Sequence, residues 1–318
     1  MKTCTRREFS KLSLTAATAA AIFGFGARRA SALAPLDPDA SKINGVQIGL
    51  NVPYSFANPK MTNEGIWTNC VLLAIGAVEL RTQPVEIFLG APEDLVFPKK
   101  GISPSESKAN GEKMAKWRKS VSIDRARDLR KKYENAGVLI QIVKVDGIFN
   151  MSDAELDYVF ALAKTLGGRA ISTEISRKED DLKRIGSFAD KHQMMVGYHG
   201  HAETKPEDWE KGFALAKFNG ANVDLGHFVA GNNTSPVPFI KEHHERITHV
   251  HVKDRKMHNG PNTPFGEGDT PIKEVLQLIR DNKWPIQATI EFEYKIPEGS
   301  DRLKEIDRAV HYCKNALY

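Results

Sequence analysis

Ile247-Thr248-His249-Val250-His251-Val252-Lys253-Asp254 is the stretch of sequence that decides the fold and the site. Side chains of a β-strand alternate between two faces, so the two valines lie on one face and His249, His251 and Lys253 lie on the other. Burying imidazoles and an ammonium group without partners costs several kcal/mol per charge. The polar face therefore predicts a polar partner, a metal ion or solvent beside this strand. The structural alternative is an edge strand with one solvated face.

The same chain contains a regular alternation of strand-like and helix-like segments. The strand-like runs are Val46–Asn51, Ala77–Arg81, Val138–Lys144, Arg169–Glu174, Met194–His199, Ala221–Leu225, Ile247–Lys253 and Ile286–Glu293. The helix-like stretches include Ala154–Leu166, Asp180–His192, Pro206–Phe218, Pro271–Asn282 and Asp301–Ala316. Eight strand and helix repeats predict an α/β fold, a closed (β/α)8 TIM barrel that forms a single domain over residues 46–318.

Two features bear on this fold prediction. An open doubly wound sheet is the alternative, but Gly49-Leu50-Asn51-Val52-Pro53 stands where a Gly-x-Gly-x-x-Gly turn would follow the first strand. The stretch Thr82–Ser120 interrupts the alternation with prolines, glycines and lysines. We expect it to form a loop or short helix over the barrel mouth, or else a solvated surface segment.

Residues 1–32 have the features of a twin-arginine signal peptide. Arg6-Arg7 precedes an apolar run from Leu12 to Gly26, and Ala30-Ser31-Ala32 offers the small residues of a cleavage site. The apolar run is shorter than the roughly 20 residues that a membrane span needs. We therefore expect export to the periplasm with no stable membrane anchor, and a linker at residues 33–45.

The charge balance bears on the kind of partner, and the cysteine content bears on disulfide formation. The chain has 45 Lys and Arg and 40 Asp and Glu. The signal segment holds six basic residues and one acid, and subtracting these leaves 39 of each sign in the remainder. A formally neutral protein disfavours a nucleic-acid partner. Cys70 and Cys313 are predicted to be separate core thiols, with a disulfide between them as the alternative.

Carboxylates and imidazoles stand at the ends of five successive predicted strands. These segments are Ser172-Thr173-Glu174, Tyr198-His199-Gly200-His201, Asp224-Leu225-Gly226-His227, His249-Val250-His251-Val252-Lys253 and Glu291-Phe292-Glu293. Strand ends meet at one rim of a TIM barrel, so their shared position favours a site over five unrelated caps or ion pairs. Oxygen and nitrogen ligands without cysteine predict a divalent ion: Mn²⁺, Co²⁺, Mg²⁺, Fe²⁺ or Zn²⁺. Such an ion beside two carboxylates suits proton removal next to a carbonyl, because the ion stabilises the enediolate.

The order of these residues resembles the xylose isomerase-like TIM barrels, commonly labelled sugar phosphate isomerase/epimerase. The resemblance rests on a Glu at the fourth strand, Asp-x-x-His at the sixth, His-x-Lys-Asp at the seventh and Glu at the eighth, and it covers roughly residues 44–318. It implies four metal ligands, namely Glu174, Asp224, His251 and Glu291. It also implies that Glu174 and Glu291 are the catalytic acid and base. The implied substrate-binding residues are His199, His201, His227, Lys253 and Arg81. Glu293 competes with Glu291 as the ligand, and Glu291 is favoured because it directly follows the apolar run that ends at Ile290.

We therefore expect a metal-dependent sugar isomerase or epimerase whose partner is a small-molecule sugar. A 3-keto-glycoside lyase, which eliminates the aglycone of an oxidised glycoside at the same site, is the close alternative. A non-catalytic sugar-binding barrel is less favoured, because it has no reason to retain four ligands. An endonuclease IV-type enzyme would need histidines where the second and third strands end in Arg81 and in Lys144-Val145-Asp146. A homodimer is compatible with long mouth loops, although the sequence indicates no interface.

Overall fold

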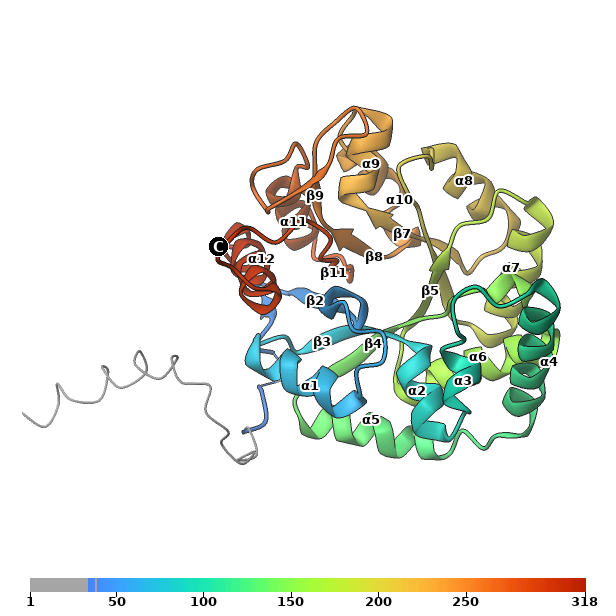
Figure 1. Ribbon diagram of the computed structural model, residues 1–318. Helices are drawn as coiled ribbons and strands as arrows, with labels where there is room; N and C mark the ends of the chain where they lie inside the picture. Colours follow the sequence, from blue (N-terminus) through green and yellow to red (C-terminus); the bar gives the residue numbers. More distant parts are fainter. Residues whose placement is uncertain (1–33, 38) are drawn as a thin grey trace, which may run out of the picture. The chain divides into compact units, whose positions relative to one another are not determined.

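Eight parallel strands close into a barrel at the centre of residues 34–318, with helices around it (Figure 1). The computed structural model describes residues 34–37 and 39–318. The sheet order is β2-β11-β8-β7-β6-β5-β4-β3, and pairing of β2 with β3 closes it. The barrel strands are β2 (Val46–Val52), β3 (Ala77–Arg81), β4 (Leu139–Lys144), β5 (Ala170–Glu174), β6 (Met195–His199), β7 (Asn219–Asp224), β8 (Ile247–Val252) and β11 (Gln287–Ile290). This arrangement confirms the predicted single-domain TIM barrel.

The predicted strands are found close to their expected bounds, and the largest difference is at the last one. Strand β11 ends at Ile290 rather than at Glu293. The backbone N–H of Glu291 still donates to Val252 O at 3.1 Å, after which the chain leaves the sheet. Glu291 and Glu293 therefore lie on a loop at the rim. Three short strands decorate the barrel: β1 (Lys42–Ile43) pairs with β2, and β9 (Asp254–Arg255) pairs with β10 (Asn262–Thr263).

Helices connect the strands around the outside of the barrel. They are α1 (Asn63–Leu72), α2 (Thr82–Leu89), α3 (Glu93–Val96), α4 (Pro104–Ser120), α5 (Arg125–Asn135), α6 (Asp153–Leu166), α7 (Glu179–His192), α8 (Pro206–Leu215), α9 (Leu225–Asn232), α10 (Val237–His243), α11 (Ile272–Asp281) and α12 (Arg302–Ala316). Three short 3₁₀ turns complete the connections at Tyr54–Phe56, Ile148–Asn150 and His244–Arg246. The five helices expected from the sequence are present, and α8 ends three residues before the expected Phe218.

The segment Thr82–Ser120 contains short helices, as one of the expected alternatives had it, but it is more helical than expected. It contains α2, α3 and the 17-residue α4. A capping serine, Ser103, accepts the N–H of Glu106 and is followed by Pro104 at the first helical position, which favours helix initiation. A buried ion pair also holds α4, because Arg118 contacts Glu86 at 2.8 Å and Glu155 at 3.1 Å. Tertiary contacts therefore order a segment whose composition indicates a loop.

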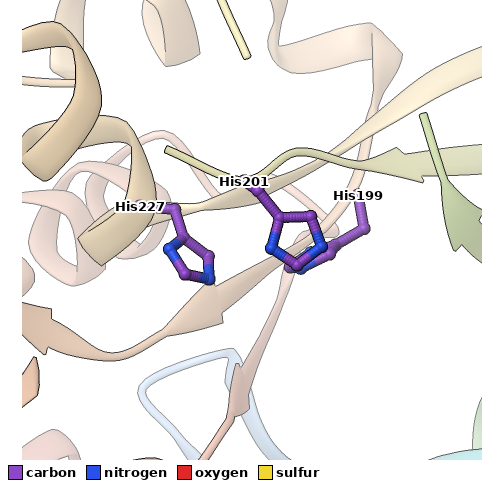
Figure 2. Close-up of side chains that lie close together, drawn as sticks. All are labelled: His199, His201 and His227. Carbon is purple, nitrogen blue, oxygen red and sulfur yellow. The ribbon is translucent and has the colours of Figure 1, made fainter. Parts of the chain in front are cut away.

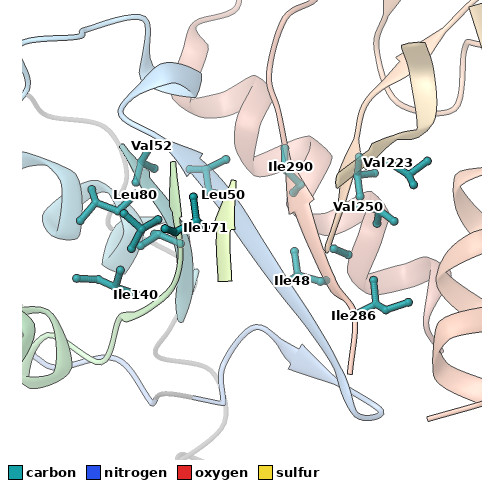
Figure 3. Packing of buried hydrophobic residues seen from close by; sticks show 14 of the residues in the cluster. Ile48, Leu50, Val52, Leu80, Ile140, Ile171, Val223, Val250, Ile286 and Ile290 are labelled. Atoms are coloured by element: carbon teal, nitrogen blue, oxygen red, sulfur yellow. The ribbon is translucent and has the colours of Figure 1, made fainter. Parts of the chain in front are cut away.

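Alternation along the strands separates an apolar outer layer from a polar interior. On β8, Val250 and Val252 belong to a buried apolar cluster that also contains residues of the surrounding helices, and Figure 3 shows part of this cluster. On the other face, His249 and His251 contact Glu79 of β3. Strands β8 and β3 are not neighbours in the sheet, so these contacts cross the barrel interior. The polar face of β8 is thus buried inside the barrel, and β8 is no edge strand.

The predicted signal peptide at residues 1–32 lies outside the residues that the structure describes. Within residues 34–37 and 39–318, no helix has both the length and the apolar character to span a membrane. Cys70 and Cys313 are buried free thiols, which confirms the prediction of two separate core cysteines.

A close approach between β6 and β8 gives the first testable prediction. A Cβ atom placed on Gly197 would lie 2.0 Å from Thr248 Oγ1, much closer than van der Waals contact. Gly197→Ala should therefore lower the free energy of unfolding by about 1–3 kcal/mol, the usual effect of overpacking. Urea denaturation followed by circular dichroism measures this change.

The matched control is the same substitution in a Thr248→Ala background, which removes the clashing hydroxyl. We expect the effect of Gly197→Ala to be smaller there. Equal effects in both backgrounds would contradict a packing origin.

Candidate active site

Four buried side chains converge at the carboxyl-terminal rim of the barrel. They are His199, Asp224, His251 and Glu291, and one ligand atom from each lies within 4.8 Å of the others. We call this group the rim cluster. It comes from β6, β7, β8 and the residue after β11, so four adjacent strands of the barrel build it.

The rim cluster contains donor atoms that the described part of the protein leaves without hydrogen bonds. His199 Nδ1, Asp224 Oδ2 and His251 Nδ1 are buried and make no well-aligned hydrogen bond among the described residues. Asp224 Oδ2 does lie 3.2 Å from Lys253 Nζ, and His251 Nδ1 lies 3.4 Å from Glu291 Oε2. Buried polar atoms are usually satisfied, and an unsatisfied one calls for a bound group. Nitrogen and carboxylate oxygen atoms together suit a divalent transition-metal ion, and these residues therefore fit such an ion.

Asp224 has both a structural and a site role. Its Oδ1 accepts the backbone N–H of His227 at 2.7 Å and caps the first turn of α9. The second carboxylate oxygen, Oδ2, is directed into the rim cluster and lies 3.9 Å from His251 Nδ1. One side chain thus ends strand β7, starts α9 and supplies an acceptor to the site.

Glu79 orients His251 from inside the barrel. Both side chains are fully buried, and Glu79 Oε2 lies 2.5 Å from His251 Nε2. An ionised carboxylate only accepts hydrogen bonds, so Nε2 carries the proton and Nδ1 faces the rim cluster. Burial raises the pKa of Glu79, but the charge of His251 outweighs it and holds this pKa well below its usual range. Burial lowers the pKa of His251, yet Glu79 and Glu291 raise it to about 10.

Lys253 neutralises three carboxylates beside the rim cluster. Its ammonium group is buried and lies 2.7 Å from Glu291, 2.5 Å from Glu293 and 3.2 Å from Asp224. Burial lowers the pKa of Lys253, but these negative charges raise it above its ordinary value. Lys253 therefore stays protonated and compensates charge that the barrel could not otherwise bury.

The two glutamates after the eighth strand have different partners. Glu291 joins the rim cluster and also accepts the side-chain amide of Asn51 at 2.8 Å. Glu293 contacts Lys253 through Oε2 at 2.5 Å, and Tyr54 donates its hydroxyl to Oε1 at 2.5 Å. With Glu291 and His227, Glu293 forms a second group of possible ligands beside the rim cluster.

Three histidines lie side by side at the rim, as Figure 2 shows for His199 of β6, His201 of the following loop and His227 of α9. The ring centroids of His199 and His201 are 4.8 Å apart, and those of His201 and His227 are 5.0 Å apart. Burial lowers the pKa values of His199 and His227, so both are neutral near pH 7.

His227 lies between two cationic groups that can only donate hydrogen bonds. Arg255 Nη1 lies 2.7 Å from its Nδ1, and Lys253 Nζ lies 3.1 Å from its Nε2. A neutral imidazole has one acceptor nitrogen, so His227 accepts from one of these two groups at a time. Lys253 and His227 therefore lie side by side, where the ammonium group can donate to a substrate oxygen.

Glu174 is placed beside the rim cluster and is not a member of it. Its carboxylate contacts Lys144 at 2.5 Å and His201 Nε2 at 2.7 Å. Burial raises the pKa of Glu174, but the hydrogen bond from His201 and the charge of Lys144 lower it to about 2. The hydrogen bond to Glu174 raises the pKa of His201. The ligand role of Glu174 stays a prediction, and His199 joins the other three expected ligands in the rim cluster.

Arg81 lies further from the cluster than the other expected substrate contacts. It forms an ion pair with Asp146 at 2.7 Å and stacks over the ring of Tyr54, with 4.8 Å between Cζ and the ring centroid. The ends of the second and third barrel strands are thus joined to each other in this structure.

Sequence reasoning missed Glu79, Asn51, Lys144 and Tyr54. Glu79 precedes Arg81 by two residues on the same strand, so alternation alone places both on the polar face. That signal could have found Glu79. The other three become site residues through tertiary contacts: Lys144 with Glu174 on the next barrel strand, and Asn51 and Tyr54 with Glu291 and Glu293 far away in the sequence.

Comparison with known proteins identifies the fold family. Residues 121–316, more than half of the chain, match the family described as Xylose isomerase-like TIM barrel. An inosose dehydratase of Clostridium botulinum is 27% identical over 135 residues, which cover 35% of this chain and 45% of that relative. The chain therefore matches less than half the length of this relative.

Solved structures show the same architecture. The probable 3-DHS dehydratase of Bacillus anthracis superposes with a TM-score of 0.57 and 14% identity, covering 84% of this chain and 98% of that one. The 3-keto-D-glucoside 4-epimerase of E. coli superposes with a TM-score of 0.56 and 10% identity, covering 85% and 99%. At these identities the likeness shows a shared fold.

A prediction distinguishes two possible sets of metal ligands, one that contains His199 and one that contains Glu174. His199→Ala should lower metal affinity by about 10- to 100-fold or more, because it removes a cluster donor, whereas Glu174→Gln should change it little. Titration of the metal-free protein with Mn²⁺ or Zn²⁺ by calorimetry measures both affinities. An equal loss in the two variants would instead support the ligand set that contains Glu174.

Glu79 gives a second prediction at this site. Glu79→Gln keeps the size of the side chain but removes the charge that orients His251, so metal affinity should fall by roughly 10- to 100-fold. The same calorimetric titration provides the measurement. Glu86→Gln is the matched control, because Glu86 is also buried and ion-paired but lies on α2 with Arg118. A loss of affinity of the same size in the control would show a general effect of stability.

Proposed function

Because the chain belongs to the xylose isomerase-like TIM barrel family, we propose that it is a divalent-metal-dependent sugar isomerase or epimerase. The reaction is proton transfer at the carbon next to a sugar carbonyl. The observation that carries this proposal is the rim cluster, which adjoins the hydrogen-bonded pair of His201 and Glu174 with 4.8 Å between the ring centroids of His199 and His201. A possible cation site and a proton acceptor thus lie close together.

The metal would be held by His199, Asp224, His251 and Glu291. When bound there, a divalent cation supplies a Lewis acid that polarises the carbonyl and an adjacent hydroxyl oxygen of the sugar. Glu79 and Asn51 support this set from the barrel interior, because each hydrogen-bonds to a cluster member.

His201 is the proposed proton acceptor. Its Nε2 is engaged by Glu174 at 2.7 Å, which leaves Nδ1 to take the proton from carbon. The pKa of Glu174 is about 2, so this carboxylate is a poor base by itself. The pKa of His201 is raised, which makes the imidazole the better acceptor. Glu174 then acts as a positioning residue, and the catalytic role implied by the sequence passes to its hydrogen-bonded partner.

Lys253 and His227 complete the proposed pocket on the opposite side. Lys253 stays protonated among its carboxylates, and His227 lies beside it with 3.1 Å between Nε2 and Nζ. The ammonium group of Lys253 would bind the oxygen on which negative charge develops as the proton leaves. Proton return to either face or to the neighbouring carbon would give an epimer or an isomer.

A lyase is the second candidate, and a specific observation favours it. Tyr54 donates to Glu293, and Glu293 contacts Lys253, so a chain of polar groups reaches from the rim to the protein surface. Burial together with Glu293 raises the pKa of Tyr54, which keeps its hydroxyl protonated. Such a chain could deliver a proton to a departing oxygen during β-elimination. Release of water or an alcohol would distinguish this reaction from isomer formation.

Export through the twin-arginine route stays a prediction. It favours free or oxidised sugars over phosphorylated ones as substrates, because phosphorylated sugars are mainly cytoplasmic.

Solvent exchange tests the proposed function directly. Protein loaded with Mn²⁺ should incorporate deuterium from D₂O next to the carbonyl of at least one sugar in a panel of ketoses, aldoses and keto-glycosides. Removal of the metal by a chelator should abolish incorporation, and His201→Ala should slow it by about 10²- to 10⁴-fold because general base catalysis is lost. Proton NMR of the sugar provides the measurement.

His311→Ala is the matched control for this experiment, since His311 is an exposed histidine on α12. It should keep the wild-type rate and metal content. Exchange that survives both chelation and His201→Ala would refute the proposal.

A further inference from the structure

The ammonium group of Lys253 lies among residues that could themselves hold a metal ion. These residues are His227, Glu291 and Glu293, whose ligand atoms lie within 4.8 Å of one another. We call them the second ligand group. The Nζ atom of Lys253 lies 3.1 Å from the imidazole Nε2, 2.7 Å from Glu291 Oε2 and 2.5 Å from Glu293 Oε2. A positive charge is therefore already present where this group converges.

Two carboxylate oxygens lie between this ammonium group and the rim cluster. Asp224 Oδ2 lies 3.2 Å from Lys253 Nζ and 3.9 Å from His251 Nδ1. Glu291 Oε2 lies 2.7 Å from Lys253 Nζ and 3.4 Å from His251 Nδ1. An oxygen in such a position can serve two neighbouring cations, which in two-metal sites lie about 3.5–4 Å apart. The two ligand groups are thus two halves of one centre that share Glu291.

Packing and hydrogen bonds hold the ammonium group at this point. Lys253 is only 2% exposed, and a Cβ atom placed on Gly226 would lie 2.5 Å from its Cγ, so the lysine stem passes close to the backbone of α9. Asn51 donates to Glu291 Oε1 at 2.8 Å, and Tyr54 donates to Glu293 Oε1. Each glutamate therefore keeps its other oxygen, Oε2, directed at Lys253.

The charges around Nζ match one ammonium group and one divalent ion. Asp224, Glu291 and Glu293 supply three negative charges, and Lys253 with one divalent ion at the rim cluster supplies three positive ones. A second divalent ion beside the ammonium group would leave two positive charges in excess among these groups. Excess charge of this kind is costly in a buried site.

The distances around Nζ also suit an ammonium group better than a metal ion. The three carboxylate oxygens lie 2.5–3.2 Å from it, as in charge-assisted hydrogen bonds. Bonds from carboxylate oxygen to zinc measure about 2.0–2.2 Å, so a metal ion at this point would need the oxygens to move inward by roughly 0.3–1 Å. The observed spacing is that of a site built around nitrogen.

From these observations we propose that Lys253 takes the place of a second metal ion. The protein then has a centre with one exchangeable divalent ion at the rim cluster and one cation fixed to the chain. The fixed cation serves the oxygen on which charge develops, so the reaction needs a single metal ion. This inference rests on the proposed function in one respect, the divalent ion at the rim cluster.

The test counts the ions that the full chain binds. Metal-free protein is titrated with Mn²⁺, and electron paramagnetic resonance separates free from bound ions. We expect the wild-type protein to bind one ion and Lys253→Ala to bind two, because the variant leaves space and uncompensated carboxylates, ligands that suit Mn²⁺. Two neighbouring Mn²⁺ ions also couple magnetically, and this signal should appear only in the variant. Circular dichroism checks that the variant is folded.

Two further variants and one small molecule make the test specific. Adding Glu293→Gln to Lys253→Ala should return the count to one, because it removes a ligand of the second ion. Propylammonium, which replaces the part of the lysine that alanine lacks, should compete with the second ion and leave the first bound. Lys144→Ala is the matched control, since Lys144 is equally buried but contacts Glu174, which belongs to neither ligand group. It should bind one ion.

The inference is overturned if the wild-type protein binds two coupled Mn²⁺ ions, a result that depends on no variant. It is also overturned if folded Lys253→Ala binds only one ion, or if the Lys144→Ala control gains a second one. Failure of the proposed function gives a different result: the wild-type protein would bind one ion but exchange no deuterium with any sugar, and the role of Lys253 as the second cation would stand.

Discussion

Negative charge buried inside the barrel is the constraint on which the rest of this structure depends. Glu79, Asp224 and Glu291 are almost fully enclosed, and carboxylates in such surroundings need opposite charges and hydrogen bonds. Strand β8 and the residue after it supply both, because His251 and Lys253 stand two residues apart on one face. Removing either partner would leave an uncompensated charge in the interior. The segment that balances the charge therefore also contributes a member of the rim cluster.

Residues in the interior of the barrel hold members of the rim cluster in place. Glu79 reaches His251 from across the barrel, while Asn51 reaches Glu291 from the neighbouring strand. The donor atoms at the rim are thus held by partners below them rather than by flexible loops. Precise placement of this kind is what metal binding and proton transfer require. Above the rim, Tyr54 donates its hydroxyl to Glu293, and both residues line a cavity at the mouth of the barrel.

The fold was largely predictable because its signal is local. Each strand carries its own alternation and each helix its own caps, so the eight repeats can be counted without knowing any contact. The long helix α4 within Thr82–Ser120 was not predicted because a tertiary contact holds it, the pairing of Arg118 with Glu86 and Glu155. The ends of strands were approximate for the same reason, since the last paired residue depends on the neighbouring strand.

The sequence by itself determined that carboxylates and histidines meet at one rim, because parallel strands of a closed barrel bring their carboxyl ends together. Only the tertiary structure decided how these groups divide. It placed His199 in the rim cluster, paired Glu174 with Lys144 and His201, and turned Glu293 toward Tyr54. The physical reason is that a side chain's partners depend on strand register and on neighbours up to 240 positions away in the chain, as for Asn51 and Glu291. Residue type and strand order fix which groups are available, and three-dimensional packing fixes which atoms touch.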